Sequence, residues 1–237
     1  MGIQIDTEEI SSLNHEQKFV LPAHKSDLLI AALGRCCSPD PEFPVGIVSS
    51  IYYDTAELHF LYEKVDSDYL KTKVRVRWYS EVGTGTAIGN AFVEAKYRVG
   101  SRRRKVRQAT DISGDWLKQQ PLTRSDLIRI PDQLRRSGVR LRQPLQPLIT
   151  VSYERHRFVE PVSGVRVALD RRITTDAVNP RLALAKGHHP LPVAVFEIKG
   201  RSRGLPERLR VVTKLGCRRG SFSKLSSCFE AVTWRHL

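Results

Sequence analysis

Five short segments of the chain carry charged residues, mostly Lys or Arg, at alternating positions, the spacing that lines one face of a β-strand with charge. These basic rows lie at residues 73–78, 92–98, 103–107, 153–157 and 195–199. Because side chains alternate across a strand, we expect each segment to present a charged face on one side and an apolar or small face on the other. Arg grips phosphate oxygens with a planar fork and Lys offers a compact point charge, so the rows indicate binding of an anion.

Two environments could receive the basic rows. Antiparallel sheets commonly expose one face to water, and a solvated face is the simpler interpretation. A solvated face normally mixes both signs, however, whereas these rows are mostly Lys and Arg with Glu94 and Glu197 as isolated acids. Like-charged rows that face one another repel unless a polyanion lies between them. We therefore expect a sheet curled around an anion, with the bases inside and the apolar rows outside under helices.

The composition supports a polyanionic partner without identifying it. Among 237 residues, 39 Lys+Arg against 25 Asp+Glu give a formal net charge of +14 at pH 7, which favours nucleic acid, anionic lipid or polyphosphate. No stretch approaches the ~18 consecutive apolar residues of a membrane span, and the first residues do not resemble a secretion signal. Cys36, Cys37, Cys217 and Cys228 have no metal-ligand spacing and are expected to be reduced thiols. These features predict a cytoplasmic protein with no transmembrane segment.

Length and composition predict a single α+β domain over residues 1–237, with two domains as the less favoured alternative. Patterning predicts strands at 15–21, 45–54, 72–80, 90–98, 102–110, 148–159, 164–175 and 192–200, helices at 23–37, 205–215 and 222–234, and a short helix or turn at 57–64. The segment 83–89 lacks the Gly-Lys-Ser/Thr ending of a phosphate loop and is interpreted as a hairpin connection. Strands with charge on one face predict a closed, antiparallel eight-stranded β-barrel with room inside for one slim ligand.

Nine short motifs then occur in a fixed order along the chain. They are Glu16-x-Lys18-Phe19, Ser50-Ile51-Tyr52-Tyr53-Asp54, Lys73-x-Arg75-x-Arg77-Trp78-Tyr79, Phe92-Val93-Glu94-x-Lys96, Lys105-x-Arg107, Tyr153-x-Arg155, Leu169-Asp170, Phe196-Glu197-x-Lys199 and Phe222-Ser223-Lys224. Together they resemble the VTC domain, the catalytic domain of polyphosphate polymerases in the CYTH-like triphosphate tunnel metalloenzyme superfamily. The resemblance covers residues 14–230, approximately, which it implies are the core of the domain. The resemblance implies a tunnel barrel that passes the terminal phosphate of a nucleoside triphosphate, usually ATP, to a polyphosphate chain, with a divalent metal, Mn²⁺ or Mg²⁺.

Phosphoryl transfer depends mainly on positioning and on cationic stabilisation of the transferring group. Residues on the basic rows or in the motifs are therefore expected to line the tunnel. The expected catalytic residues are Arg75, Arg77, Lys96 and Lys199, and the expected phosphate-binding residues are Lys18, Lys105, Arg107, Tyr153, Arg155, Ser223 and Lys224. Arg107 and Arg157 share the rows but have weaker motif support, and surface ion pairing is an equal alternative for both.

Three of the other expected roles have structural alternatives. Glu197 would point into a basic tunnel, where a carboxylate suits Mg²⁺ or Mn²⁺, with Glu16 and Glu94 as further candidate metal ligands. Its alternative is a salt bridge to Lys199 or a neighbouring Arg. Tyr153 could donate its hydroxyl to phosphate or simply pack. Ser223 begins a predicted helix, where it could bind an anion or act as a plain N-cap.

One departure separates the chain from the hydrolytic branch of the superfamily. Tunnel triphosphatases typically begin with Glu-x-Glu-x-Lys, whereas this chain reads Asn14-x-Glu16-x-Lys18. Loss of the first acid weakens a metal site near the hydrolytic water and favours transfer to phosphate. An inorganic or nucleoside triphosphatase of the same fold stays open as an alternative, and only the product distinguishes it from a polymerase.

A non-enzymatic nucleic-acid-binding barrel is the remaining alternative, since basic strands are typical of such proteins. Single-strand binders interleave many aromatic residues with the bases for stacking. Only Tyr79, Phe92 and Tyr153 share the basic rows here. Nucleic acid is therefore the less favoured partner, behind ATP or another nucleoside triphosphate and polyphosphate, pyrophosphate or triphosphate.

Overall fold

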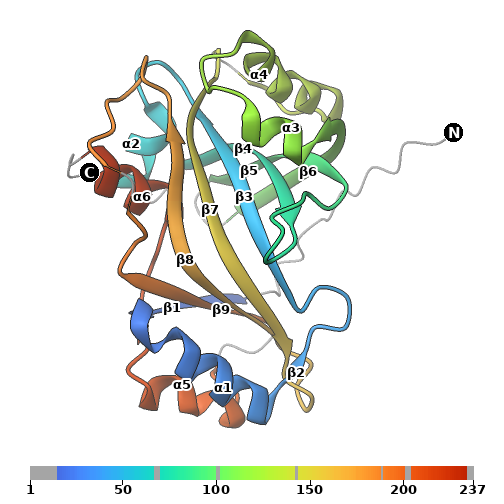
Figure 1. The fold of residues 1–237 in the computed structure, drawn as a ribbon, viewed down its shortest axis with the longest axis vertical. Helices are drawn as coiled ribbons and strands as arrows, with labels where there is room; N and C mark the ends of the chain where they lie inside the picture. The colour runs from blue at the N-terminus through green and yellow to red at the C-terminus, as the bar shows by residue number, and fades with distance from the viewer. Residues whose placement is uncertain are drawn as a thin grey trace, which may run out of the picture.

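The computed structural model describes residues 15–66, 70–99, 102–141, 144–187, 189–200 and 204–233. Ten strands form one antiparallel sheet in the order β10-β1-β9-β8-β7-β3-β4-β5-β6, with β2 paired to β7 (Figure 1). Their bounds are β1 His15–Pro22, β2 Ser38–Pro39, β3 Val45–Asp54, β4 Leu70–Ser80, β5 Asn90–Val99, β6 Arg102–Ser113, β7 Gln146–Val159, β8 Arg166–Val178, β9 Val193–Gly200 and β10 Arg218–Arg219. The eight predicted strands are therefore present, and β2 and β10 add two short ones.

The α-helices are α1 Ser26–Cys36, α2 His59–Asp66, α3 Gly114–Gln119, α4 Ser125–Arg129, α5 Val211–Lys214 and α6 Lys224–Thr233, and the 3₁₀ helices are η1 Ala23–Lys25, η2 Ile130–Ser137 and η3 Glu207–Arg210. Helices α1, α3, α4 and α5 cover the outer side of the sheet. Segment 83–89 connects β4 to β5, as expected for a hairpin. No helix in the described ranges is both long and apolar enough to span a bilayer.

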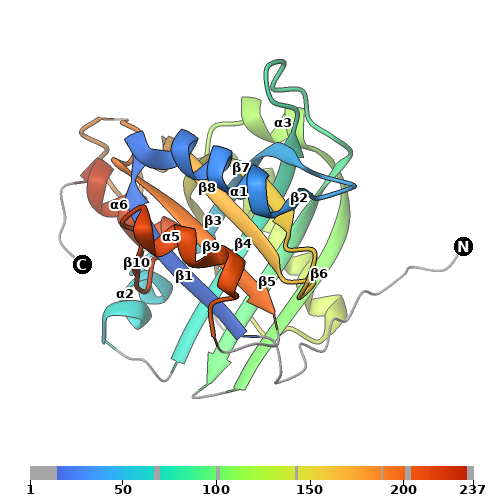
Figure 2. The same cartoon turned by 90° about the horizontal axis from the view of Figure 1, so that it is seen from below.

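The sheet curls until its two ends face each other. Lys96 on β5 lies 3.8 Å (Nζ to Oε2) from Glu16 on β1, although β9, β8, β7, β3 and β4 separate these strands in the sheet order. Figure 2 shows β1 and β9 crossing in front of β4 and β5 when the molecule is seen from below. The predicted closed barrel is only partly found, because β6 and β10 end the strand order and no ladder joins them among the described strands.

The apolar rows face outward and pack under helices, as expected. Val74, Val76 and Trp78 of β4 join side chains of α3, α4 and η2 in one buried cluster. Phe196 and Ile198 of β9 join side chains of α1, η3 and α5 in another. Because side chains alternate along a strand, burial of these apolar rows on the outer face leaves the intervening basic side chains on the concave face.

The outer face of β7 is polar at Glu154 and His156, where an apolar or small row was expected. Glu154 and His156 alternate with the basic row there, and their side chains contact each other at 2.6 Å (Oε1 to Nε2) on the outer face. Arg171 of β8 also donates to Glu154 Oε1, at 2.7 Å. These ion pairs satisfy the half-buried polar groups, so this strand is charged on both faces.

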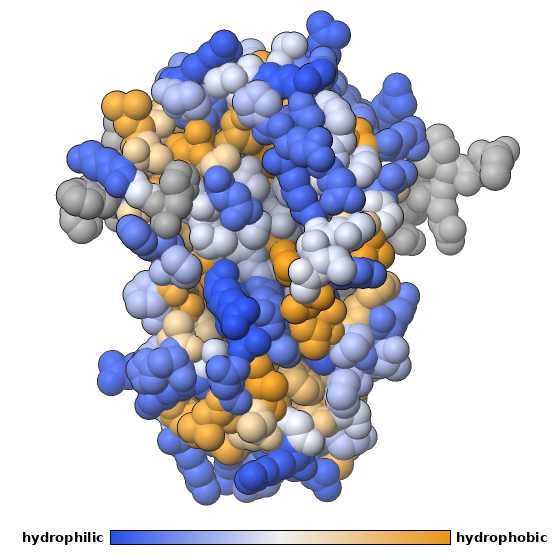
Figure 3. Space-filling model, in the orientation of Figure 1, coloured by the Kyte–Doolittle hydropathy of each residue, from blue (hydrophilic) through white to orange (hydrophobic). Residues whose placement is uncertain are grey.

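Helix α6 covers one end of the concave face. Its side chains Leu225 and Phe229 belong to a third buried cluster with Tyr52, Val151 and Val195 from the sheet. On the face of the molecule shown in Figure 3, hydrophilic side chains predominate and apolar ones form separate patches. The apolar contacts of α6 fix the position of its first turn, which faces the basic side chains described next.

Candidate functional site: a basic concave face

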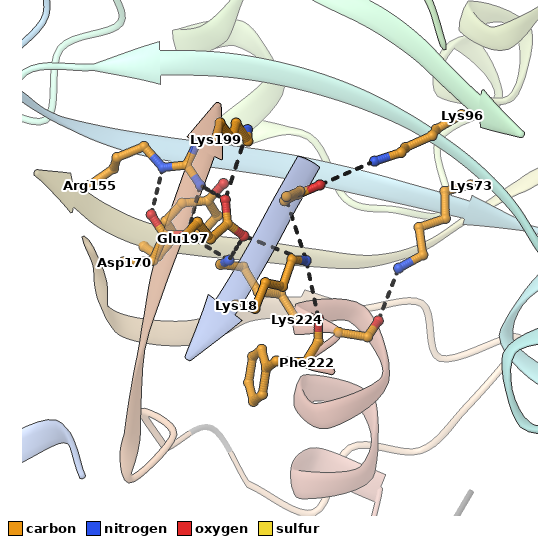
Figure 4. A network of polar contacts seen from close by, with 12 residues as sticks. Lys18, Lys73, Lys96, Arg155, Asp170, Glu197, Lys199, Phe222 and Lys224 are labelled. Carbon is orange, nitrogen blue, oxygen red and sulfur yellow. Dashed lines mark hydrogen bonds and ion pairs between the residues drawn. The ribbon is translucent and has the colours of Figure 1, made fainter. Parts of the chain in front are cut away.

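The basic rows converge on the concave face of the sheet and on the first turn of α6 (Figure 4). Contacts between distant elements show this convergence: Lys73 Nζ donates to Ser223 Oγ at 3.0 Å, and Lys224 Nζ lies 2.6 Å from Asp170 Oδ2. The concave face gathers the sequence-predicted residues Glu16, Lys18, Arg75, Arg77, Glu94, Lys96, Lys105, Arg107, Tyr153, Arg155, Glu197, Lys199, Ser223 and Lys224. The structure therefore brings these predicted residues together on one basic concave face.

Glu197 lies at the centre of four cations. Its Oε1 is 3.5 Å from Lys18 Nζ and 3.6 Å from Lys224 Nζ. Its Oε2 is 3.3 Å from Arg155 Nη2 and 4.0 Å from Lys199 Nζ. Burial disfavours the charged form, but Lys224, Arg155 and the two other cations together hold the pKa of Glu197 well below its usual range. The carboxylate is thus ionised, with bases on every side.

Asp170 of β8 is a buried anchor to which the sequence analysis assigned no role. Its side chain is 0 % exposed and accepts two hydrogen bonds from Arg155, at 2.5 Å from Nε and 2.7 Å from Nη2. Lys224 Nζ adds an ion pair at 2.6 Å. Burial raises its pKa, but Arg155 and Lys224 outweigh that effect and lower the pKa overall. Asp170 therefore fixes two cations that would otherwise be free to move.

Glu94 of β5 performs the same task on the neighbouring strands. Arg75 donates to its Oε2 from Nε at 2.7 Å, while Lys105 Nζ and Arg107 Nε lie 3.8 Å and 3.5 Å from its Oε1. Despite nearly complete burial, these cations, led by Arg75, hold the pKa of Glu94 far below its ordinary value. Such contacts favour an ion-pair role over the metal-ligand role suggested for Glu94.

Arg77 differs from the other buried cations because hydroxyl groups hold it. Its Nε donates to Ser50 Oγ at 3.2 Å and its Nη2 to Tyr153 OH at 3.4 Å. Arg77 is only 8 % exposed, and its charge helps to lower the pKa of Glu94, although no direct ion pair joins the two among the described contacts. A buried guanidinium that is held by hydroxyl groups and lacks a direct ion pair is suited to receive an anion from outside the protein.

Ser223 acts as an N-cap and also contacts a base of the site, while anion binding stays a prediction for it. Its hydroxyl accepts from the backbone N–H of Ser226 at 3.5 Å, as an N-cap does, and also from Lys73 Nζ at 3.0 Å. Lys18 Nζ donates to the neighbouring carbonyl of Phe222 at 3.3 Å. Lys73 lies on a basic row but was not among the assigned site residues, and its contact with α6 adds it to the site.

The carboxylates of this face fit a metal that is shared with phosphate. The described residues contain no group of three or more His, Cys, Asp or Glu side chains able to hold an ion. Glu16 and Glu197 both contact Lys18, at 3.8 and 3.5 Å, and are therefore neighbours. Mg²⁺ and Mn²⁺ are commonly held by one or two carboxylates together with substrate phosphates and waters. The pair matches that donor set, and the cations around it match the phosphates.

The bases differ in how firmly they are held. Side-chain exposure is 10 % for Lys224 and 12 % for Arg155, against 49 % for Lys96 and 56 % for Lys199. The first two are fixed by a buried carboxylate, whereas the other two have only ion pairs at 3.8 and 4.0 Å. The concave face thus combines two firmly held cations, Arg155 and Lys224, with two cations, Lys96 and Lys199, that can adjust to a ligand.

Comparisons with known proteins bear on the fold and on the family. The crystal structure of a "putative adenylate cyclase" from Bacillus halodurans superposes with a TM-score of 0.52 at 12% identity, over 92% of this chain and 99% of that one. A second "putative adenylate cyclase", from Vibrio parahaemolyticus, gives a TM-score of 0.44 at 14% identity, over 90% and 98%. No curated protein sequence matches the chain. Residues 13–232 match the VTC domain, and the chain belongs to the VTC domain family.

Proposed function

We propose that the concave face binds a nucleoside triphosphate, ATP in the first place, and transfers its terminal phosphate to a polyphosphate chain. The observation that carries the proposal is the buried guanidinium of Arg77, held by hydroxyl groups, among bases that converge from six strands and α6. Membership of the VTC family, whose domains handle triphosphates, supports the same conclusion. We also propose that the curled sheet encloses the ligand as a tunnel.

The chain's own residues supply positioning and charge. Arg75 and Arg155 are oriented by Glu94 and Asp170, so their remaining N–H groups point along fixed directions. Preoriented donors stabilise charge on a transferring phosphoryl group without reorganising during the reaction. Lys96 and Lys199, which are more exposed, would follow the phosphate oxygens as the bond to the leaving group lengthens.

A divalent metal would lie between Glu16, Glu197 and the phosphates. There it would neutralise charge on the bridging oxygens and orient the terminal phosphate. The cations that surround Glu197 keep its carboxylate ionised and therefore competent to bind a metal. The described residues contain no group of three or more His, Cys, Asp or Glu side chains that could hold the metal without the phosphates.

Transfer to phosphate is favoured over transfer to water. Asn14 stands where tunnel triphosphatases have an acid, and it lies outside the described residues, so this argument rests on the sequence alone. The structure adds that the bases line one continuous concave face, which can hold an acceptor chain in line with the nucleotide. A triphosphatase differs only in its acceptor.

The test is the fate of the terminal phosphate. Pure protein is incubated with ATP, Mn²⁺ and a short polyphosphate primer, and the products are separated by size. We expect ADP and chains longer than the primer, with binding that weakens as salt screens the bases. ADP with stoichiometric free phosphate and no elongation would make the protein a triphosphatase. Binding of nucleic acid in preference to polyphosphate would support the non-enzymatic alternative instead.

A further inference from the structure

The concave face is chemically different at its two ends. Along β4 the concave row runs Lys73, Arg75, Arg77, Tyr79, and six residues of strand span about 20 Å. The Lys73 end contacts α6 through Ser223. The Tyr79 end carries two aromatic and two arginine side chains. We name this group, formed by Tyr79, Phe92, Arg107 and Arg157, the aromatic end.

The four side chains of the aromatic end lie against one another, and Arg107 stacks on Phe92. The Arg107 guanidinium carbon lies 3.7 Å from the centre of the Phe92 ring, and Arg107 Nη2 donates to Tyr79 OH at 3.4 Å. The Tyr79 and Phe92 rings are 6.4 Å apart at an interplanar angle of 69°. Arg157 approaches the Tyr79 ring from another side, with its Cζ 5.9 Å from the ring centre. Two cations and two rings thus form one contact group.

This arrangement is not that of a hydrophobic core. Phe92 belongs to none of the three buried apolar clusters formed by the described residues, and Tyr79 only packs against the edge of one of them. All four side chains keep part of their surface exposed to solvent. An Arg that stacks on one aromatic ring keeps a second planar face, and nucleobases stack on such guanidinium planes and on Tyr and Phe rings. The aromatic end therefore offers flat surfaces of the kind that bind a heteroaromatic ring.

The aromatic end also adjoins the phosphate-binding bases. In the strand register Arg107 lies opposite Glu94, and Glu94 lies opposite Arg75. Phe92 lies opposite Arg77, the buried cation that is held by hydroxyl groups. A ligand whose ring stacks here would therefore direct an attached anionic chain over Arg75 and Arg77 toward Lys224 and α6.

We infer that the aromatic end binds the nucleobase of the triphosphate substrate and so orients the nucleotide, with its phosphates directed toward α6. The inference rests on the proposed function and adds a base-binding subsite to it. Stacking is tolerant of base identity, so several nucleotides should bind, purines better than pyrimidines. It also predicts that the protein distinguishes a nucleoside triphosphate from inorganic tripolyphosphate, which has no ring.

The test compares ATP with inorganic tripolyphosphate as ligands. Both affinities are measured by calorimetry without divalent metal, for the wild type, Phe92→Leu and Arg107→Lys. Leucine keeps apolar volume without a ring face, and lysine keeps the charge without a plane. We expect Phe92→Leu to weaken ATP about 10-fold or more while tripolyphosphate changes less than about 2-fold, because one stacking contact is lost. Arg107→Lys should likewise weaken ATP more than tripolyphosphate.

Two controls separate this effect from damage to the fold. Thermal unfolding of each variant shows whether it is folded, and Tyr62→Leu, which removes an exposed aromatic ring on α2, should leave both affinities unchanged. Equal loss of both ligands in Phe92→Leu and Arg107→Lys, or unchanged ATP binding in both, overturns the inference and leaves the proposed triphosphate site intact. Failure of wild-type protein to bind tripolyphosphate at all would overturn the proposed function, and the inference with it.

Discussion

Glu197→Gln should lower metal-dependent turnover by about 100-fold while nucleotide affinity stays equal or rises. Removal of a group that tunes a metal site typically costs 10–100-fold, and a direct ligand belongs at the upper end of that range. The amide keeps the shape of the carboxylate but removes a negative charge from a site with four nearby cations. Affinity for the anionic nucleotide should therefore not fall. Steady-state kinetics over a range of Mn²⁺ concentrations checks the first part and calorimetry with ATP the second.

The metal titration distinguishes a ligand from an ion-pair partner. If Glu197 binds the metal, the Mn²⁺ concentration needed for half-maximal turnover rises in the variant. If it only holds Arg155, Lys18, Lys199 and Lys224 in place, turnover falls at an unchanged Mn²⁺ requirement, and the ligand assignment is wrong. Glu207→Gln is the matched control, because Glu207 is 77 % exposed and pairs with Arg210 on η3.

Asp170→Ala should destabilise the fold by about 3–5 kcal/mol, which is the usual cost of removing one partner from a buried ion pair. The substitution leaves Arg155 and Lys224 without their closest carboxylate, at side-chain exposures of 12 % and 10 %. Saturating tripolyphosphate should restore part of the loss, since a polyanion that binds the folded state stabilises it and would neutralise the freed cations. Urea denaturation with and without tripolyphosphate measures both effects.

A milder substitution at Asp170 and a control substitution at an exposed carboxylate accompany this prediction. Asp170→Asn keeps the shape and one acceptor oxygen, so it should lose less stability than the alanine variant. Asp132→Ala removes an exposed carboxylate that pairs with Arg135 on η2, and should change stability by less than about 1 kcal/mol. A small cost for Asp170→Ala, or an equal gain from tripolyphosphate in both wild type and variant, would show that Arg155 and Lys224 do not face the ligand site.

Much of the fold follows from alternation in the sequence. Val74, Val76 and Trp78 between the bases of β4 had to be buried, and that requirement alone places Lys73, Arg75 and Arg77 on the opposite face. The resemblance carried by the motifs then predicted that these strands surround one common site. The first of these signals depends only on the alternation of side chains along a strand, which can be read from the sequence before any tertiary contact is known.

Other features depend on contacts between distant segments. The motif containing Asp170 marked the position, but its role arises only when Arg155 of β7 and Lys224 of α6 meet it. The polar outer face of β7 could not be foreseen because Arg171, on a different strand, makes burial of Glu154 tolerable. Closure of the sheet was overestimated, since strand number does not determine whether the two edge strands pair.

The aromatic end shows the same division between sequence and structure. Tyr79 and Phe92 were visible on the basic rows and counted against nucleic-acid binding because they are few. Their contacts with Arg107 and Arg157 come from four strands, β4, β5, β6 and β7, and concentrate the aromatic rings at one end of the face. The small number of aromatic residues in the sequence therefore did not indicate that they would gather at one end of the concave face.

A crystal structure with bound inorganic tripolyphosphate tests the central claim most directly. We predict that its phosphate oxygens lie at hydrogen-bond distance, about 3 Å, from the guanidinium groups of Arg77 and Arg155, with Lys199 turned toward the chain. Tripolyphosphate found only on outer basic side chains such as Arg208 and Arg210 of η3, with the concave face empty at saturating ligand, would contradict the account.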